Sequence, residues 1–150
     1  MRVDWYRGLR AGAKLGLIIF AVELTLSLLY TEVLLSWYLG YEFHWEGIGA
    51  TIIYLMGDLI IFLVVCITIG VLFPVVRARL PGDTDKVKAL IMFVPIWALY
   101  VVVSTLILVS AFGQTFLPYY EIWIVVLVIL SIPYGYLMGL LWEREEPTDW

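Results

Sequence analysis

The segment Ile48–Val76 reads IGATIIYLMGDLIIFLVVCITIGVLFPVV and contains one charged side chain, Asp58. An α-helix of about 20 apolar residues crosses the roughly 30 Å of hydrocarbon in a bilayer. This segment is longer than that, and a soluble domain of 150 residues has no interior large enough to bury several such runs. The segment therefore predicts a transmembrane helix.

Three further stretches are long and apolar enough to cross a bilayer, at about residues 13–39, 87–112 and 119–142. Short connections link the four stretches, with the sequences YEFHWEG, RARLPGDTDK and GQTFLPY. Connections of this length join antiparallel neighbours and leave no room for a separate soluble domain. The sequence thus predicts an all-α integral membrane protein, a four-helix up-down bundle that forms a single domain over residues 1–150.

The overall composition points the same way, because 63% of the residues are hydrophobic and the mean hydropathy is +0.99. The first apolar run follows a basic start but is too long for the core of a signal peptide, so we expect it to remain as a helix. Cys66 is the only cysteine in the sequence, which excludes an intrachain disulfide and a cysteine metal cluster.

The basic residues all fall on one side of the predicted bundle. They precede or open the first helix, flank the second connection or follow the fourth helix: Arg2, Arg7, Arg10, Lys14, Arg77, Arg79, Lys86, Lys88 and Arg144. Because cytoplasmic loops are enriched in Lys and Arg, we expect a multi-pass protein of a prokaryotic plasma membrane with both termini cytoplasmic. Its expected partners are the lipid bilayer and a second copy of the chain or another membrane subunit, with no nucleic acid and no cofactor.

Glycines recur at intervals of four residues in the first and fourth helices. Gly12 and Gly16 form one such pair, and Gly135 and Gly139 form the other at the same predicted depth. Small residues at this spacing let helix backbones approach closely in lipid. The glycines predict either a contact between two copies of the chain or, as the preferred interpretation, packing of the first helix against the fourth.

Three carboxyl groups lie within the predicted helices, at Glu23, Glu32 and Asp58. If the first connection turns near residues 43–44, Glu32 and Asp58 lie within about 5 Å of the same depth, at 1.5 Å of rise per residue. Glu23 then faces the opposite side of the first helix, ~13 Å deeper. No Lys, Arg or His lies at these depths, so we expect the carboxyls to be protonated at rest or paired with an imported cation.

Two functions fit such carboxyls. The preferred interpretation is a path for protons or small cations, or a site for a cationic substrate, in the first hairpin. The alternative is structural: neutral carboxyls bond hydroxyls across helix interfaces in an accessory, scaffold or assembly subunit. Catalysis is the least favoured function, because the sequence has one histidine and no Ser-His or Cys-His pairing.

One short segment of the first connection offers metal-ligating side chains, at Glu42, His44 and Glu46. In an extended chain these alternate residues point the same way, as a copper or zinc site requires. A closed zinc site needs a fourth ligand, however, so the favoured interpretation is a solvated loop without a metal.

Three motifs resemble those of small four-transmembrane-helix proteins common in archaea. They are the opening DWYRGLRAG, a central LPG followed by a basic residue and an apolar run with an early tryptophan, Trp97, and the closing GYLMGLLWER. The sequence departs from that pattern at Ala89, where the resemblance implies a glycine. The resemblance implies a four-helix membrane fold, and it implies no activity.

Overall fold

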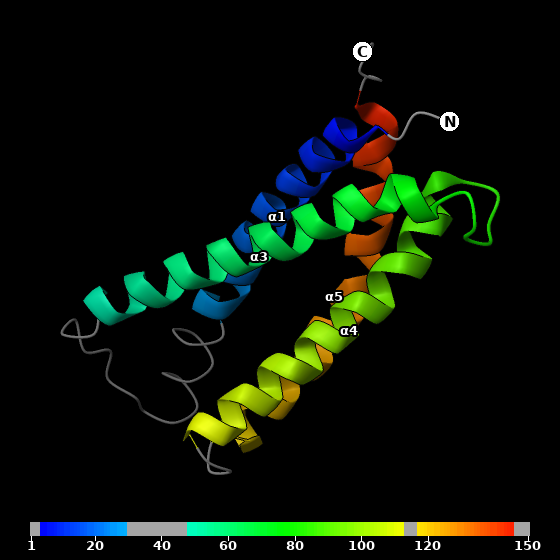
Figure 1. The fold of residues 1–150 in the computed structure, drawn as a ribbon. Helices are drawn as coiled ribbons and strands as arrows, with labels where there is room; N and C mark the ends of the chain where they lie inside the picture. Colours follow the sequence, from blue (N-terminus) through cyan, green and yellow to red (C-terminus); the bar gives the residue numbers. More distant parts are fainter. Residues whose placement is uncertain (1–3, 30–47, 113–116, 146–150) are drawn as a thin grey trace.

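A computed structural model of the protein describes residues 4–29, 48–112 and 117–145. Over these ranges the chain forms four α-helices and no strand (Figure 1). The helices are α1 (Trp5–Leu28), α3 (Ile48–Val76), α4 (Asp85–Phe112) and α5 (Leu117–Arg144). The described part of the chain therefore confirms the predicted all-α class.

Three of the described helices are long and apolar enough to cross a membrane. The qualifying stretches are Met56–Val76 in α3, Asp85–Ile107 in α4 and Ile124–Arg144 in α5. Each contains a proline inside the helix, at Pro74, Pro95 and Pro133, and the helix continues through it. Polar neighbours and adjacent helices commonly satisfy the backbone groups that such prolines release.

The start of α1 differs from the prediction, because the helix begins at Trp5 and not near residue 13. The Asp4 side chain accepts a hydrogen bond from the Arg7 backbone N–H at 2.9 Å, so Asp4 caps the helix. Hydropathy identifies the apolar part of a helix that is long enough to cross a membrane, but it does not identify a polar first turn such as this one. The predicted far end of the first helix lies outside the described residues.

The residues of the LPGDTD segment form the turn between α3 and α4. Gly82 has a φ of 120°, a left-handed conformation that glycine adopts without a steric penalty. The Thr84 hydroxyl accepts a hydrogen bond from the Val87 backbone N–H at 3.4 Å and so caps α4. Arg77 and Asp85 then form an ion pair at 3.2 Å between the end of α3 and the first turn of α4.

The four helices form two antiparallel hairpins, α1 with α3 and α4 with α5 (Figure 1). The two hairpins meet at the end where the N- and C-terminal ends of the chain lie, and they diverge toward the opposite end. Contacts between the hairpins run mainly from α1 to α5, with a smaller interface between α3 and α4. Any site built from both hairpins must therefore lie where they still touch.

Glycines bring the backbones of α1 and α3 into direct contact. The backbones of Gly8 and Gly70 lie against each other, with no room for a side chain on either residue. A Cβ added to Gly12 would lie 2.8 Å from the Cα of Ile67, which is closer than real Cβ atoms approach. Gly16 leaves slightly more room, because its nearest neighbours would be 3.1–3.2 Å away.

The glycines of α5 pack in the second hairpin. A Cβ on Gly135 would lie 2.9 Å from the Cα of Leu90, and one on Gly139 would overlap the backbone of Lys86. These contacts correct the preferred interpretation of the sequence, in which the glycines of the first and fourth helices face each other. Four-residue spacing identifies a surface for close packing but not the helix that occupies it.

Charged groups join α1 to α5 at the end where the hairpins meet. Glu145, whose side chain is 6% exposed, forms ion pairs with Arg10 at 3.3 Å and with Lys14. Arg7 donates from Nε to the Trp142 carbonyl oxygen at 2.8 Å, close to the C-terminal end of α5, where a helix favours positive charge. The first and last described helices are thus held together by one buried carboxylate and three basic residues.

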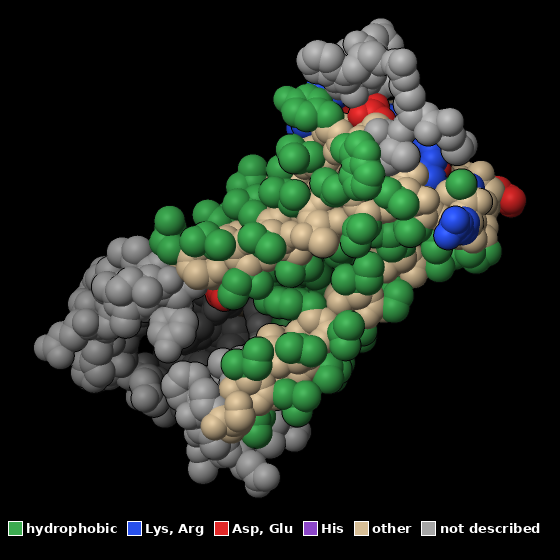
Figure 2. Space-filling view, in the orientation of Figure 1, with side chains coloured by type: hydrophobic (Ala, Val, Ile, Leu, Met, Phe, Trp, Pro, Cys, Tyr) green, Lys and Arg blue, Asp and Glu red, His purple; other side chains and the backbone are tan. Residues whose placement is uncertain are grey.

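The surface separates charge from apolar side chains. Figure 2 shows Lys and Arg gathered at one end, with hydrophobic side chains along the helices away from it. Large hydrophobic residues that are exposed on α4 include Leu99, Val102, Leu106 and Ile107. Solvent-exposed helix faces of soluble proteins are polar, whereas this face is apolar along its length.

The first prediction concerns the α1–α3 contact. We expect Gly12→Ala to destabilise the protein by about 1–3 kcal/mol because the added methyl group overlaps the α3 backbone. Gly16→Ala should cost less, since its neighbours lie slightly farther away. Gly57 has nothing within 4 Å of an added Cβ, so Gly57→Ala is the matched control and should be neutral or stabilising. Unfolding in detergent would measure all three, and equal effects at the three positions would contradict the packing.

Candidate functional site

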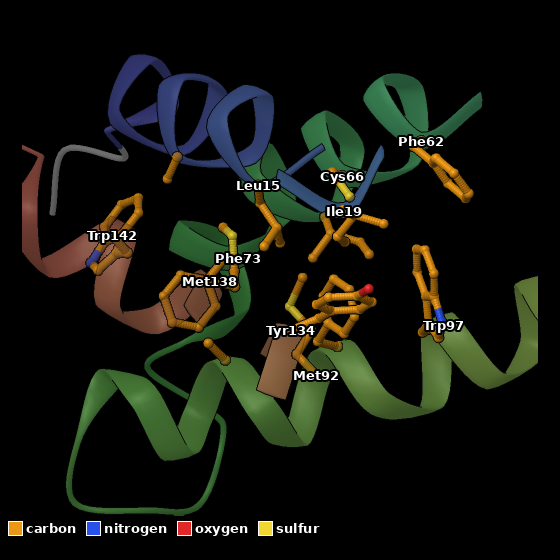
Figure 3. Packing of buried hydrophobic residues seen from close by; sticks show 14 of the residues in the cluster. Leu15, Ile19, Phe62, Cys66, Phe73, Met92, Trp97, Tyr134, Met138 and Trp142 are labelled. Atoms are coloured by element: carbon orange, nitrogen blue, oxygen red, sulfur yellow. The ribbon is translucent and has the colours of Figure 1, made fainter. Parts of the chain in front are cut away.

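The two hairpins share one buried hydrophobic cluster at the level where they meet. Figure 3 shows Leu15, Ile19 and Cys66 of the first hairpin turned toward side chains of α4 and α5. Tyr134 and Met138 of α5 enter the cluster from the other side and are 4% and 0% exposed. Polar groups that reach into this cluster are therefore removed from solvent.

Glu23 of α1 is the carboxyl group within this cluster. It is 6% exposed, and the Tyr134 hydroxyl donates a hydrogen bond to its Oε1 at 3.2 Å. The nearest basic residue along α1 is Lys14, nine residues away, which corresponds to ~13 Å of helix. Lys14 is already paired with Glu145. Glu23 thus has a neutral hydroxyl as its hydrogen-bond donor and no ion pair among the described residues.

Asp58 of α3 lies at a similar depth. Gly16 packs against Leu63, so Phe20, one turn farther along α1, lies at the depth of Asp58. Glu23 is three residues beyond Phe20, a rise of ~4.5 Å. Asp58 is exposed whereas Glu23 is buried, so the same pair has one accessible and one enclosed member.

Aromatic rings connect the remaining helices to these carboxyls. The Tyr134 ring meets Trp97 of α4 edge to face, with centroids 5.9 Å apart. Trp97 stacks on Phe62 of α3 at 5.8 Å and lies 5.1 Å from Tyr100. Tyr100 also meets Phe62 at 6.3 Å. The Trp97 indole N–H donates to the Leu127 carbonyl oxygen at 3.2 Å, which fixes the ring in the cluster.

These residues form one site at the junction of all four described helices, which we call the junction site. Its members are Glu23 of α1, Asp58 and Phe62 of α3, Trp97 and Tyr100 of α4, and Tyr134 of α5. The site combines two carboxyls with aromatic side chains and excludes bulk water from one of the two. Chemically, its carboxyls can exchange protons or pair with a positive charge.

The structure brings together two of the three carboxyls predicted from the sequence. Glu23 and Asp58 share the junction site, whereas Glu32 lies outside the described residues. The register that placed Glu32 opposite Asp58 assumed a turn near residues 43–44, and the glycine contacts set a different register. Close backbone packing fixes that register, and a loop length alone does not reveal it.

The remaining predicted candidates take no part in this site. Gly12, Gly16, Gly135 and Gly139 lie in helix-helix contacts, as described above. The weak metal-ligand set of Glu42, His44 and Glu46 lies outside the described residues. Within the ranges that the structure describes, no three His, Cys, Asp or Glu side chains are grouped to hold a metal ion.

Tyr134 and Trp97 are members that the sequence analysis did not assign to the site. A signal for Tyr134 exists in the spacing of the α5 residues that are buried. They recur at intervals of three or four residues, the period of a helix face that packs on a core: Leu127, Ser131, Tyr134, Met138 and Trp142. This period identifies the buried face of α5, but it does not reveal that the Tyr134 hydroxyl faces Glu23.

No protein-family model, curated protein or solved structure matches this chain. The class of this protein is therefore described from its fold and from the junction site. The described chain forms two helix hairpins, it contains three helices long and apolar enough to cross a membrane, and a carboxyl-aromatic site lies between the hairpins.

The second prediction tests the hydrogen bond between α1 and α5. Tyr134→Phe and Glu23→Gln, combined in a double-mutant cycle, should show a coupling energy of about 0.6–1.7 kcal/mol, the range measured for such bonds in helical membrane proteins. Tyr136→Phe is the matched control, because Tyr136 is 46% exposed on the same helix. Reversible unfolding in mixed micelles gives the energies, and additive effects of the two substitutions would argue against the bond.

Proposed function

We propose that the protein moves protons or cations across a membrane and uses Glu23 and Asp58 of the junction site to do so. The observation that carries the proposal is that a buried and an exposed carboxyl lie at a similar depth on adjacent helices, with no ion pair to a basic residue among the described residues. An ionised carboxylate in hydrocarbon costs at least about 2.5–3.5 kcal/mol. A proton or an imported cation removes that cost.

The proposal includes a membrane arrangement. We place all four helices across a plasma membrane, with both termini and the 77–88 connection in the cytoplasm, because every basic residue of the sequence falls on that side. The apolar faces of α3, α4 and α5 support the arrangement. Glu23 then lies about 20 Å from Arg10 along α1, well inside the hydrocarbon. The same arrangement agrees with the resemblance to small four-helix proteins of archaeal type.

Transport proteins expose a site to one side of the membrane at a time, and the shape of this molecule suits such a cycle. The hairpins are joined by ion pairs at the basic end and diverge at the other (Figure 1). The junction site lies between these two regions. A rocking motion of one hairpin against the other would change access to Glu23 without breaking the glycine contacts inside each hairpin.

A second function is favoured by the Tyr134 bond itself. A neutral Glu23 that accepts this bond also ties α1 to α5, and the contact has the chemistry of a structural link. In that case the protein is a non-catalytic accessory, scaffold or assembly subunit. A second copy of the chain or another membrane subunit would then cover part of the apolar surface.

The third prediction separates these functions by flux. Purified protein in liposomes with a pH gradient should dissipate the gradient, while Glu23→Gln and Asp58→Asn should reduce the rate at least tenfold, because amides keep the shape but do not exchange protons. Asp83→Asn, in the exposed connection, is the matched control and should keep the wild-type rate. If the wild-type protein shows the same flux as empty liposomes, the translocation function is wrong and the accessory function remains.

The fourth prediction concerns orientation. In a Cys66→Ala background, cysteines introduced at Glu46 and Gln114 should react with a membrane-impermeant thiol reagent in intact cells, and one at Gly82 should react only after lysis. Mass spectrometry of the labelled protein provides the measurement. Labelling at Gly82 in intact cells would reverse the proposed arrangement.

A further inference from the structure

We propose that the contact between α1 and α5 is a gate in front of Glu23, and that the Glu145 carboxylate is the latch that keeps this gate closed. The gate opens when the two hairpins turn about the connection between α3 and α4, at residues 77–84. This inference rests on the proposed function, because it assigns the control of access to the same site. The motion is measured without flux, so each can be tested separately from the other.

The polar contacts between α1 and α5 lie along one line, which we call the seam. Arg10 and Lys14 of α1 pair with Glu145, directly after the end of α5. Farther along α1, Glu23 accepts the hydrogen bond from Tyr134. Lys14 and Glu23 are nine residues apart, which corresponds to ~13 Å of helix. The seam therefore leads from the charged end of the molecule to the buried carboxyl, and water that entered it at that end would reach Glu23.

The other side of the molecule offers an axis for the motion. The two hairpins are linked covalently only by residues 77–84, between the end of α3 and the start of α4. The interface between α3 and α4 is smaller than the seam. Gly82 lies in this connection, and Arg77 pairs with Asp85 across it at 3.2 Å. Hinges consist of a few residues in loops or at the ends of helices, as here. Turning about this connection separates α1 from α5 and keeps the glycine contacts inside each hairpin.

Glu145 is suited to hold the seam closed because it is buried and its partners belong to the other hairpin. Its side chain is 6% exposed, and removing one partner of a buried ion pair is strongly unfavourable, since it leaves a charge without compensation. Both of its cations are on α1, so their attraction joins the hairpins and folds neither of them. The ion pair of Lys86 with Glu143, at 3.1 Å, differs because it joins α4 to α5 within one hairpin.

The closed seam also contains a buried polar group that it leaves unsatisfied. The indole N–H of Trp142 is buried and has no hydrogen-bond partner among the described residues. The guanidinium carbons of Arg7 and Arg77 lie 4.5 and 5.5 Å from the centroid of this ring, so the ring of α5 is held against the first hairpin. A buried N–H without an acceptor disfavours the closed state, and water would satisfy it in an open seam. The ion pairs therefore favour the closed arrangement, and the indole N–H favours the open one.

The test uses the native Cys66, which is fully buried where the hairpins meet (Figure 3). A buried thiol is inert, so its rate of alkylation by a small hydrophilic reagent, in protein held in nanodiscs, measures opening. Glu145→Gln keeps the shape but removes the charge, and it should raise the rate at least about tenfold. Glu143→Gln is the matched control and should keep the wild-type rate, because its ion pair lies inside one hairpin. Lys14→Glu combined with Glu145→Lys retains two cations and one carboxylate in the seam and should restore slow alkylation.

A distance measurement distinguishes opening of the seam from unfolding. In a Cys66→Ala background, spin labels at Leu9 of α1 and Ile132 of α5 report on both hairpins, whereas labels at Leu9 and Leu72 of α3 report on one. All three positions are exposed. Glu145→Gln should populate a longer distance between Leu9 and Ile132 at least about tenfold more than the wild-type protein does, and it should leave the distance between Leu9 and Leu72 unchanged.

The outcomes separate this inference from the proposed function. An alkylation rate and a Leu9–Ile132 distance that are the same in Glu145→Gln and the wild-type protein would overturn the gate. A changed Leu9–Leu72 distance would also overturn it, because the first hairpin would then not move as a unit. Proton flux from a protein whose seam stays closed would overturn the gate while the proposed translocation stands. Opening controlled by Glu145 in a protein that shows no flux would support the gate and remove the translocation.

Discussion

Close backbone contact between α1 and α3 is the constraint on which the rest of the structure depends. Gly8, Gly12 and Gly70 remove the side chains that would separate the two helices, and the resulting fit allows one register. That register puts Glu23 near the depth of Asp58 and turns Phe62 toward the second hairpin. The carboxyl pair is thus a consequence of glycine packing several turns away along the same helices.

The second hairpin is also held by glycine packing, since Gly135 and Gly139 of α5 lie against the α4 backbone. Contacts inside the hairpins are close and backbone-to-backbone, whereas contacts between the hairpins use side chains. They include the ion pairs of Glu145 at one end, the Glu23–Tyr134 hydrogen bond and the aromatic rings around Trp97. Side-chain contacts can rearrange while each hairpin stays intact, which makes the hairpins the natural rigid units of any motion.

Sequence reasoning predicted the parts of this structure that depend on one helix at a time. The apolar runs predicted α3 at residues 48–76, as observed, and predicted each end of α4 and α5 to within two residues. It also identified glycine surfaces and two site carboxyls. It could not identify the helices that these surfaces contact, because helix pairing depends on the fit of two surfaces and not on the spacing within one.

The Glu23–Tyr134 contact illustrates this limit, since it joins residues 111 positions apart in the sequence. It exists because both hairpins bring a polar group to the same buried level. Glu145 is a similar case, because the structure buries its carboxylate beside two basic residues of α1 that lie more than 130 positions away in the sequence. Such pairings become visible only when the positions of all four described helices are known.

The chemistry of the Tyr134 hydroxyl explains how a carboxyl could change its protonation state and keep its place. A phenol O–H donates to an ionised carboxylate and, more weakly, to the carbonyl oxygen of a protonated carboxyl. The bond to Glu23 can therefore persist in both states, and the Trp97 ring packed edge to face on Tyr134 restrains the donor. The exposed Asp58 side chain has no such hydrogen bond to another described residue. The junction site thus contains one carboxyl held in position by a hydrogen bond and one exposed carboxyl without such a bond.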